Sequence, residues 1–313
     1  MKILIICSYR SYAVHTDYAA PFIYEQVQSL KQIDCKIDYF FVRGGGIKAY
    51  IKAILQLRKL IKNKPPHIIH AHGGLCGFVA NCQIKVPVIT TYHGSDINNP
   101  KFRFFSKIAI KKSFYNIFVS SKLVDIIHPA KKNYAVIPCG VDTDTFFPMD
   151  KLDCRKKLGW GENKIYILFS KAFFVKVKNY PLAKAAVDKI PNATLIELDG
   201  YNREEINLLM NACDVALMTS FTEGSPQFIK EAMACNCPIV STDVGDVAKV
   251  IENIKNCFIC PFDPDYIASK ILICLQSKER LPEARERIEN EYSIKKVAHK
   301  IKYIYEKASD ANQ

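Results

Sequence analysis

The sequence has no long hydrophobic run, which limits the classes of protein to which it can belong. No window approaches the roughly 20 uninterrupted apolar residues of a membrane-spanning helix, and the opening run Lys2–Cys7 is too short for a signal peptide. Short internal repeats are also absent. With 49% hydrophobic and 24% charged residues, the composition excludes disordered and collagen-like chains. We therefore expect a folded, cytoplasmic protein.

Acidic residues are scarce relative to basic ones, and the deficit lies in one half of the chain. The 31 Asp and Glu residues stand against 44 Lys and Arg residues, which gives a net charge of +13. Residues 1–150 hold 20 basic and 9 acidic residues (+11), whereas residues 151–313 hold 24 and 22 (+2). The excess indicates an anionic partner for the first half, and leaves open a membrane surface, a phosphorylated substrate or a nucleic acid.

The four cysteines with metal-like spacing lack the glycine-containing turns in which zinc ligands usually lie. The chain has 12 cysteines, scattered mostly within apolar runs, and we interpret them as reduced, buried thiols. Cys235, Cys237, Cys257 and Cys260 have a spacing that would suit tetrahedral zinc. However, Cys237 precedes Pro238 and a strand, and Cys260 closes an apolar strand. We therefore expect no metal site.

Two series of apolar runs rich in Ile, Val, Phe and Tyr alternate with longer amphipathic segments. This pattern is typical of parallel strands covered by helices on both faces. The first series consists of Lys2–Ser8, Lys36–Val42, His67–Ala71, Pro87–Tyr92, Tyr115–Ser120 and Tyr134–Pro138. The second consists of Lys164–Ser170, Ala193–Leu198, Val215–Ser220, Pro238–Asp243 and Asn256–Pro261.

The pattern predicts two doubly wound α/β domains. Between Gly140 and Gly161 the periodicity breaks without supplying a strand, so we expect domains at 1–150 and 151–292. Apolar residues at helical spacing predict a terminal helix at about 293–308, which we expect to pack back on the first domain. Ligands bind beyond the carboxyl ends of such strands, so we expect the site in the cleft between the domains.

The stretch Phe221–Ala234, which follows a strand of the second series, carries the clearest functional signal. Glu223 follows the strand, Gly224 lets backbone approach a ligand closely, and Pro226 suits the first turn of a helix. Free amides at a helix start attract phosphate. Glu231 lies two helical turns beyond Glu223, where it can accept hydrogen bonds from a pair of hydroxyls such as those of a ribose.

The spacing of the two glutamates is not itself informative. Glu197 with Glu205 and Glu283 with Glu291 have the same spacing and read as ordinary surface glutamates. The order of strand, glycine, proline and helix around Glu223 therefore carries the signal.

In this context the chain resembles the retaining glycosyltransferases of family 4 (glycosyl transferases group 1), which have the GT-B fold. Besides the Glu-x7-Glu pair, the supporting motifs are His70–Gly74, Thr91–Asp96, Ile137–Asp142 with Phe146, and Asp243–Asp246. The resemblance covers almost the whole chain. It implies two Rossmann-like, doubly wound domains that face each other across a cleft, with the sugar nucleotide held mainly by the second domain and the acceptor mainly by the first.

Roles follow from the resemblance, residue by residue. Glu223 is expected to contact the donor sugar, with His93 nearby, and the amides of Gly224 and Ser225 to contact the sugar or phosphate. Glu231 is expected to bind the ribose hydroxyls. The expected catalytic residues are Glu223, Lys178 and His93, and the donor-binding ones are Lys171, Lys176, Gly200, Tyr201, Gly224, Ser225, Pro226 and Glu231.

Two loops depart from the family pattern. A phosphate-binding basic pair should follow the first strand of the second domain, where Lys178 is the strongest candidate. Ser170-Lys171 replaces the usual Gly-Arg, so either Lys171 or Lys176 can supply the second cation. The loop Ser8–His15 has no glycine. The acceptor-side candidates are Arg10, His72 and Asp96.

The resemblance implies a metal-independent, retaining transferase of the hexosyltransferase type with a nucleotide-diphosphate sugar as substrate and no other cofactor. Its acceptor is expected in surface polysaccharide or lipid-linked glycan assembly. Two other classes stay open: a non-catalytic nucleotide-sugar or nucleic-acid binding protein on the same scaffold, and a nucleotide-sugar epimerase. No nucleic-acid motif is present, so no nucleic acid is expected.

Two basic segments of the first half bear on membrane contact. Lys101–Lys107 mixes aromatic and basic residues and is followed by Lys111 and Lys112, which suits the anionic inner face of a membrane. We expect peripheral contact there. In Ile47–Lys64, apolar residues recur at helical spacing, and we interpret this segment as an ordinary core-facing helix. Those residues are Ile47, Tyr50, Ile51, Ile54, Leu57 and Ile61.

Overall fold

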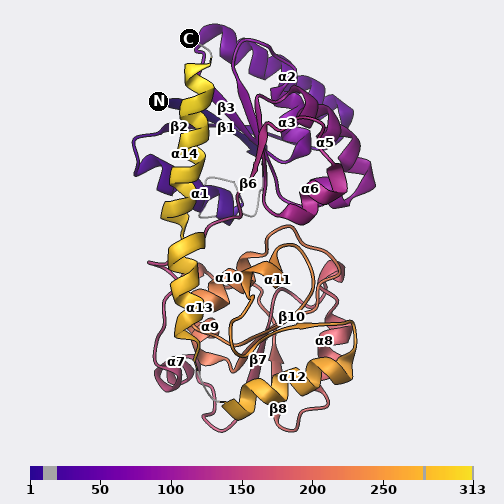
Figure 1. Ribbon diagram of the computed structural model, residues 1–313, viewed down its shortest axis with the longest axis vertical. Helices are drawn as coiled ribbons and strands as arrows, with labels where there is room; N and C mark the ends of the chain where they lie inside the picture. The colour runs from indigo at the N-terminus through magenta and orange to yellow at the C-terminus, as the bar shows by residue number, and fades with distance from the viewer. Residues whose placement is uncertain (10–19, 278–279, 312–313) are drawn as a thin grey trace. The chain divides into compact units, whose positions relative to one another are not determined.

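The computed structural model describes residues 1–9, 20–277 and 280–311 (Figure 1). It divides into two compact units. The first comprises Met1–Gly140 with Ile294–Gln313, and the second comprises Val141–Ser293. Each unit is built around one parallel sheet, so the predicted pair of parallel α/β domains is confirmed.

The first unit has a six-stranded sheet in the order β2-β1-β3-β4-β5-β6. Its strands are β1 (Lys2–Ser8), β2 (Lys36–Val42), β3 (Ile68–His72), β4 (Val88–Tyr92), β5 (Tyr115–Phe118) and β6 (Tyr134–Val136). Its helices are α1 (Pro21–Lys31), α2 (Gly46–Asn63), α3 (Gly74–Ala80), α4 (Ser95–Asn98), α5 (Pro100–Lys112), α6 (Ser121–Ile127) and α14 (Ile294–Asp310).

Successive side chains of β1 point to opposite faces of this sheet, and a separate hydrophobic core lies on each face. Ile3 and Ile5 join a cluster with residues of α1 and α14, whereas Leu4 and Ile6 join a cluster with residues of α2 and α3. Helix α14 buries its apolar stripe, including Ile301 and Tyr305, in the first of these clusters. The C-terminal helix is therefore part of the first unit.

Helix α2 does not bury all the apolar residues expected to face the core. Leu57 and Ile61 are buried, but Ile47 is 79% exposed and Ile51 is 52% exposed. The interpretation of this segment as an ordinary core-facing helix is therefore wrong for its first turns. The buried residues of the helix are Ala53, Leu57 and Ile61, all of which follow its first turns.

The second unit has a five-stranded parallel sheet in the order β11-β10-β9-β7-β8. Its strands are β7 (Ile165–Phe169), β8 (Ala193–Ile196), β9 (Val215–Met218), β10 (Ile239–Thr242) and β11 (Cys257–Cys260). Its α-helices are α7 (Lys151–Leu158), α8 (Tyr180–Val187), α9 (Arg203–Ala212), α10 (Gln227–Ala234), α11 (Val247–Val250), α12 (Pro264–Ser277) and α13 (Pro282–Arg287), with a 3-10 turn η1 (Lys176–Lys178) and a π-helical turn η2 (Ile288–Tyr292).

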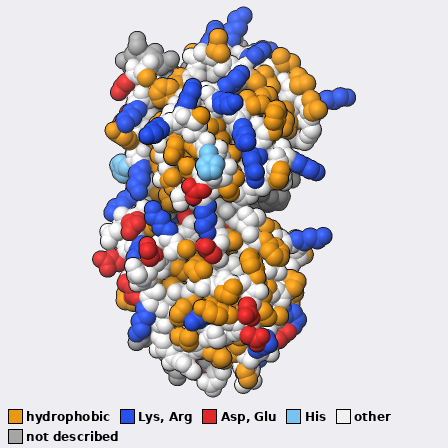
Figure 2. All heavy atoms as spheres, turned by 45° about the vertical axis from the view of Figure 1, so that its right-hand side comes forward, with side chains coloured by type: hydrophobic (Ala, Val, Ile, Leu, Met, Phe, Trp, Pro, Cys, Tyr) orange, Lys and Arg blue, Asp and Glu red, His pale blue; other side chains and the backbone are white. Residues whose placement is uncertain are grey.

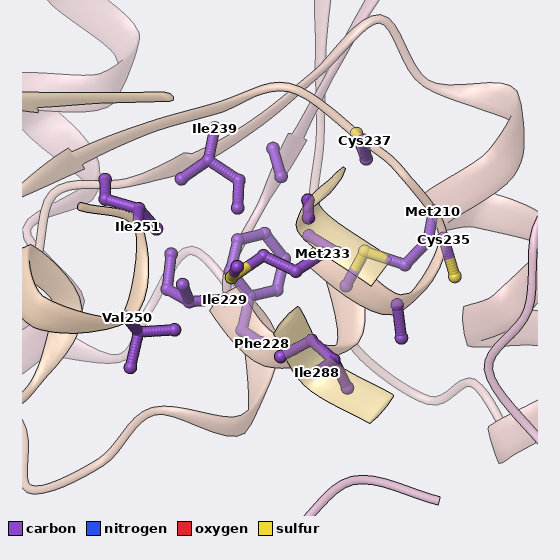
Figure 3. Packing of buried hydrophobic residues seen from close by; sticks show 14 of the residues in the cluster. Met210, Phe228, Ile229, Met233, Cys235, Cys237, Ile239, Val250, Ile251 and Ile288 are labelled. Atoms are coloured by element: carbon purple, nitrogen blue, oxygen red, sulfur yellow. The ribbon is translucent and has the colours of Figure 1, made fainter. Parts of the chain in front are cut away.

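One core of this unit is built around α10. Phe228, Ile229 and Met233 lie among buried residues of β10, α11 and η2 (Figure 3). Val141 and Phe146 are fully buried in the same cluster. The segment after Gly140 therefore packs with the second unit, and the units divide at 140 rather than near 150.

The strand order fixes where the ligand-binding edge of the second sheet lies. The chain runs from β7 outward to β8 and then returns to place β9 on the other side of β7. The topological switch point is thus between β7 and β9, and ligands of such sheets bind beyond the carboxyl ends of the strands there. Among the described residues, no helix has both the length and the hydrophobicity to cross a membrane.

Candidate active site

At the switch point of the second unit, Lys178 and Glu223 form an ion pair. Lys178 Nζ donates a hydrogen bond to Glu223 Oε1 at 2.6 Å, and the two side chains are only 16% and 17% exposed. Lys178 belongs to η1, in the connection after β7, and Glu223 to the loop after β9. Two residues 45 apart in sequence therefore meet because their strands are neighbours.

Backbone contacts hold these two loops together. The amide of Phe221 donates to the carbonyl of Val177 at 2.9 Å. Thr219 Oγ1 donates to the carbonyls of Lys178 at 2.9 Å and Asn179 at 3.0 Å. Asn179 has a left-handed backbone (φ 54°) that turns the chain from η1 into α8. The separation of Lys178 from Glu223 is therefore set by fixed backbone.

The loop at Gly224 is held from the opposite side by the loop after β10. Gly245 has φ +55°, and a Cβ there would lie 2.4 Å from the carbonyl oxygen of Gly224. Only glycine fits so close a backbone approach. Pro226 is the residue directly before α10, one position ahead of the first turn for which the sequence suits it. The amides of this helix start lie at the carboxyl edge of the sheet, where they can bind an anion.

Glu231 is paired with a residue that the sequence analysis missed. It is 3% exposed, and its Oε1 lies 2.8 Å from Arg203 Nη2 at the start of α9. The Arg203 guanidinium also covers the ring of Phe146, 4.5 Å from the ring centroid. Because α9 begins with an Asn202 capping box, its first residue is fixed in place. That capping signal is legible in the sequence, but the pairing with Glu231 requires the fold.

The remaining donor-side candidates surround these groups. Gly200, with φ +77°, and Tyr201, 40% exposed, lie in the loop between β8 and α9, just before Arg203. Lys171 and Lys176 are exposed at the same edge of the sheet, in the connection after β7. Among the lysines of this connection, Lys178 is the one that forms the ion pair with Glu223.

In the first unit, two buried histidines of β3, His70 and His72, and the half-buried His93 just after β4 form a row. His72 Nδ1 lies 3.0 Å from His93 Nε2, and His93 Nδ1 lies 3.8 Å from Cys139 Sγ. His70 contacts the Tyr305 hydroxyl at 2.5 Å and Thr91 Oγ1 at 2.7 Å. The row therefore extends from α14 to the loop that carries His93.

Burial keeps these histidines neutral. It lowers the pKa of His93 from 6.5 to about 4, and with the neighbouring His93 it lowers the pKa of His70 to about 3. Burial, His70 and His93 together hold the pKa of His72 well below 6.5. At neutral pH each ring therefore offers one donor and one acceptor nitrogen.

Asp96 organises the loop at His93. Its carboxylate accepts hydrogen bonds from the amides of Gly94 at 2.9 Å, Gly74 at 3.1 Å and His93 at 3.2 Å. Burial raises its pKa to about 6 against the opposing effect of these amides. Asp96 thus has a clear structural role in joining the starts of α3 and α4. The third acceptor-side candidate, Arg10, lies outside the described residues.

The cysteine spacing does not assemble a metal site. Across residues 1–9, 20–277 and 280–311, no group of three or more His, Cys, Asp or Glu side chains could hold a metal ion. Cys237 instead lies 3.4 Å from Cys213, sulfur to sulfur, within the core. The cysteine series is therefore mainly a set of packing residues.

Each of the two units is thus an α/β unit on a parallel sheet, and the second carries the Lys178–Glu223 pair and the start of α10 beyond the carboxyl ends of its strands, where α/β sheets of this kind bind ligands. Two family models match the sequence, one for each unit. "Glycosyltransferase Family 4" matches residues 14–145, and "Glycosyl transferases group 1" matches residues 177–277. The chain belongs to these GT-B glycosyltransferases.

Two relatives of known sequence show how much of the chain this similarity covers. An uncharacterized glycosyltransferase of Methanocaldococcus jannaschii is 24% identical over 85% of this chain and 82% of its own length. The UDP-Gal:alpha-D-GlcNAc-diphosphoundecaprenol alpha-1,3-galactosyltransferase of Escherichia coli is 23% identical over 87% and 84%. The similarity in each case extends over most of both chains.

Solved structures share the fold. Sucrose-phosphate synthase from Thermosynechococcus elongatus superposes with a TM-score of 0.86 at 16% identity, covering 99% of both chains. Anabaena HepE in complex with UDP-glucose gives a TM-score of 0.72 at 18% identity, covering 98% of this chain and 100% of that one. The predicted GT-B class is thus confirmed.

Proposed function

We propose that this glycosyltransferase is a retaining, metal-independent enzyme that moves a sugar from a nucleotide-diphosphate sugar to an acceptor hydroxyl. The observation that carries the proposal is the Lys178–Glu223 pair at the switch point of the second sheet. It puts one cation and one carboxylate where a ligand of this sheet would lie. A charged, mostly buried pair of this kind suits a reaction that separates charge.

In the proposed reaction, the bond from the anomeric carbon to the diphosphate oxygen breaks and a bond to the acceptor oxygen forms. Negative charge develops on the departing diphosphate. Lys178 and the amides at Gly224 and Ser225 stabilise that charge, which needs no metal ion. The acceptor proton goes to the departing phosphate, and attack from the face that it leaves retains the anomeric configuration.

The remaining side chains of the second unit bind the donor. Glu231 accepts hydrogen bonds from the ribose hydroxyls, and Arg203 holds its carboxylate in place. Gly200 and Tyr201 lie beside Arg203 and contact the base. In the first unit, neutral His93 supplies a hydrogen bond to the donor sugar, and His72 fixes its ring orientation.

We further propose that the acceptor is a surface polysaccharide or lipid-linked glycan and that the protein works at the cytoplasmic face of a membrane. The relative from Escherichia coli is named for a diphosphoundecaprenol acceptor, which supports a lipid-linked one here. Helix α5 exposes Phe102 (41%) and Phe104 (64%) among lysines. Figure 2 shows basic and hydrophobic side chains side by side on this unit, a combination that favours an anionic bilayer.

A thermal-shift screen tests the donor half of the proposal. The purified protein is heated with UDP, GDP, ADP and their common sugar conjugates, with and without magnesium. A ligand that binds the folded state raises its melting temperature. We expect one nucleotide to do so without magnesium. No shift with any nucleotide would favour a non-catalytic protein on this scaffold, and a magnesium-dependent shift would contradict metal independence.

A further inference from the structure

Beside Glu231, the same helix carries a lysine that is entirely buried. Lys230 is 0% exposed, and its Nζ donates a hydrogen bond to Ser225 Oγ at 2.5 Å. Ser225 Oγ in turn donates to Asp246 Oδ2 at 2.6 Å. Lys230 Nζ lies 3.8 Å from the same carboxylate oxygen. We call these three residues the Lys230 cluster.

The cluster joins two loops at the carboxyl edge of the second sheet. Ser225 follows β9, and Asp246 follows β10, where Gly245 packs directly on Gly224. The Ser225 hydroxyl donates its one hydrogen bond to Asp246 and accepts one from Lys230, so its hydrogen bonds are made within the protein. The backbone amide of Ser225 is what remains for a ligand.

A buried pair of charges is an unfavourable way to gain stability. Removing an ammonium and a carboxylate from water costs free energy that their attraction barely returns, and apolar side chains of similar size often serve the fold as well or better. The Asp246 carboxylate even has one buried oxygen, Oδ1, with no hydrogen-bond partner among the described residues. What the charges do provide is a directional constraint on Ser225.

We propose that Lys230 is a positioning residue that, through Ser225 and Asp246, holds the Gly224–Pro226 loop in the conformation that receives the sugar and phosphate of the donor. The inference rests on the proposed function and adds a residue to it. Lys230 and Glu231 are adjacent in α10 but serve different ends of the ligand. Lys230 acts on the transfer step, while Glu231 and Arg203 act on nucleotide binding.

The test compares Lys230→Met with the charge-free double variant Lys230→Met/Asp246→Asn. The single variant leaves Asp246 as an unpaired buried charge and should lower the melting temperature. The double variant removes that charge and should recover most of the loss. Lys249→Met is the matched control, because Lys249 is exposed on α11, three residues from Asp246.

Two quantities are measured in each variant, one rate and one binding affinity. The first is release of nucleoside diphosphate from the nucleotide sugar with water as acceptor, and the second is affinity for UDP, GDP or ADP, whichever shifts the wild type. We expect both Lys230 variants to release diphosphate at least about 10-fold more slowly, with nucleotide affinity within about 2-fold of wild type. The control should match the wild type in both.

The outcomes separate this inference from the proposed function. If the double variant regains wild-type turnover together with its melting temperature, the cluster serves folding only and the inference is wrong. Loss of nucleotide affinity equal to the loss of turnover also overturns it. If the wild type itself binds nucleotide sugars but never releases diphosphate or transfers sugar, the proposed function fails, and the positioning role fails with it.

Discussion

Arg203 Nη2 lies 2.8 Å from Glu231 Oε1, although Arg203 begins α9 and Glu231 lies within α10. The Glu231 side chain is 4% exposed and that of Arg203 is 31% exposed, so the carboxylate is largely removed from water while its partner is partly solvated. The guanidinium of Arg203 holds the Glu231 carboxylate in one orientation. The carboxylate is then ready to accept further hydrogen bonds without rearrangement.

The first prediction concerns this pair. Glu231→Ala should weaken nucleotide binding about 10- to 100-fold, the range for hydrogen bonds to a charged group. Arg203→Gln should weaken it as well and should also lower the melting temperature, because a buried carboxylate loses its partner. Titration calorimetry with the nucleotide checks both. Glu204→Ala, exposed in the same turn of α9, is the control, and an equal loss there would contradict the assignment.

The second prediction separates turnover from binding at Lys178. Lys178→Ala removes positive charge at the departing diphosphate, so it should lower turnover about 100-fold or more while nucleotide affinity changes much less. Steady-state kinetics of donor hydrolysis or transfer checks it. Lys184→Ala is the control, since Lys184 lies on α8 and pairs only at the surface with Asp188. Wild-type kinetics in the Lys178 variant would overturn the site.

The third prediction uses two glycines with similar backbones and different surroundings. Gly159 (φ +67°) has open space where a Cβ would lie, whereas at Gly245 (φ +55°) a Cβ would meet the carbonyl of Gly224. Gly159→Ala should cost about 1 kcal/mol of stability, the strain of a left-handed residue, and leave turnover unchanged. Gly245→Ala should cost more and lower turnover, because it displaces the Gly224 loop. Equal effects on melting temperature and kinetics would show that the contact is unimportant.

The position of a site residue could be predicted from the sequence where it depends only on the end of the strand that precedes the residue. Glu223 and Pro226 follow an apolar strand and precede a helix, so their location at the carboxyl edge could be predicted from local pattern. The partners of these residues could not, because Arg203 and Asp246 come from other loops and are brought close only by strand order. Nor does local pattern show that Lys230 points into the protein, since a lysine on a helix is usually solvated.

The domain boundary, too, is only partly visible in local sequence pattern, because it also depends on contacts made in the fold. The break in periodicity after Gly140 is legible, but the side on which Val141 and Phe146 pack is decided by contacts with the second core. Likewise, the spacing of Ile47 and Ile51 fits a buried stripe, yet both side chains are exposed in the fold, and spacing along one helix does not show which of its turns are covered.

The fourth prediction concerns the surface of α5. Phe102→Ser/Phe104→Ser should reduce binding to vesicles that contain anionic lipid, because both rings are exposed beside Lys101 and Lys107. Binding of the wild type should also weaken as salt rises. Vesicle sedimentation at low and high salt measures both effects. Leu152→Ser, which removes an exposed apolar side chain from α7, is the control. A wild type that ignores anionic vesicles at low salt would refute membrane contact.

The last prediction is a pH dependence of stability in the first unit. His93, with a pKa of about 4, and His70, with a pKa of about 3, are neutral when folded but take up protons when unfolded, near pH 6.5. Between pH 6.5 and 4 the unfolded chain therefore binds more protons at these sites, so stability falls as pH falls. Each such histidine contributes about 1.4 kcal/mol per pH unit in that window.

Asp96 acts in the opposite direction. With a pKa of about 6 in the fold and 3.8 as the ordinary value, it holds a proton in the folded state between pH 6 and 3.8, and this favours folding as pH falls. Because His72 adds to the histidine effect, the histidines outnumber the carboxyl group and acid should destabilise this unit. Scanning calorimetry between pH 7 and 5 measures the change. In His93→Gln the melting temperature should depend less steeply on pH, whereas an unchanged slope would show that His93 is already charged in the fold. The exposed His299 on α14 provides the control, since His299→Gln should leave the slope as it is in the wild type.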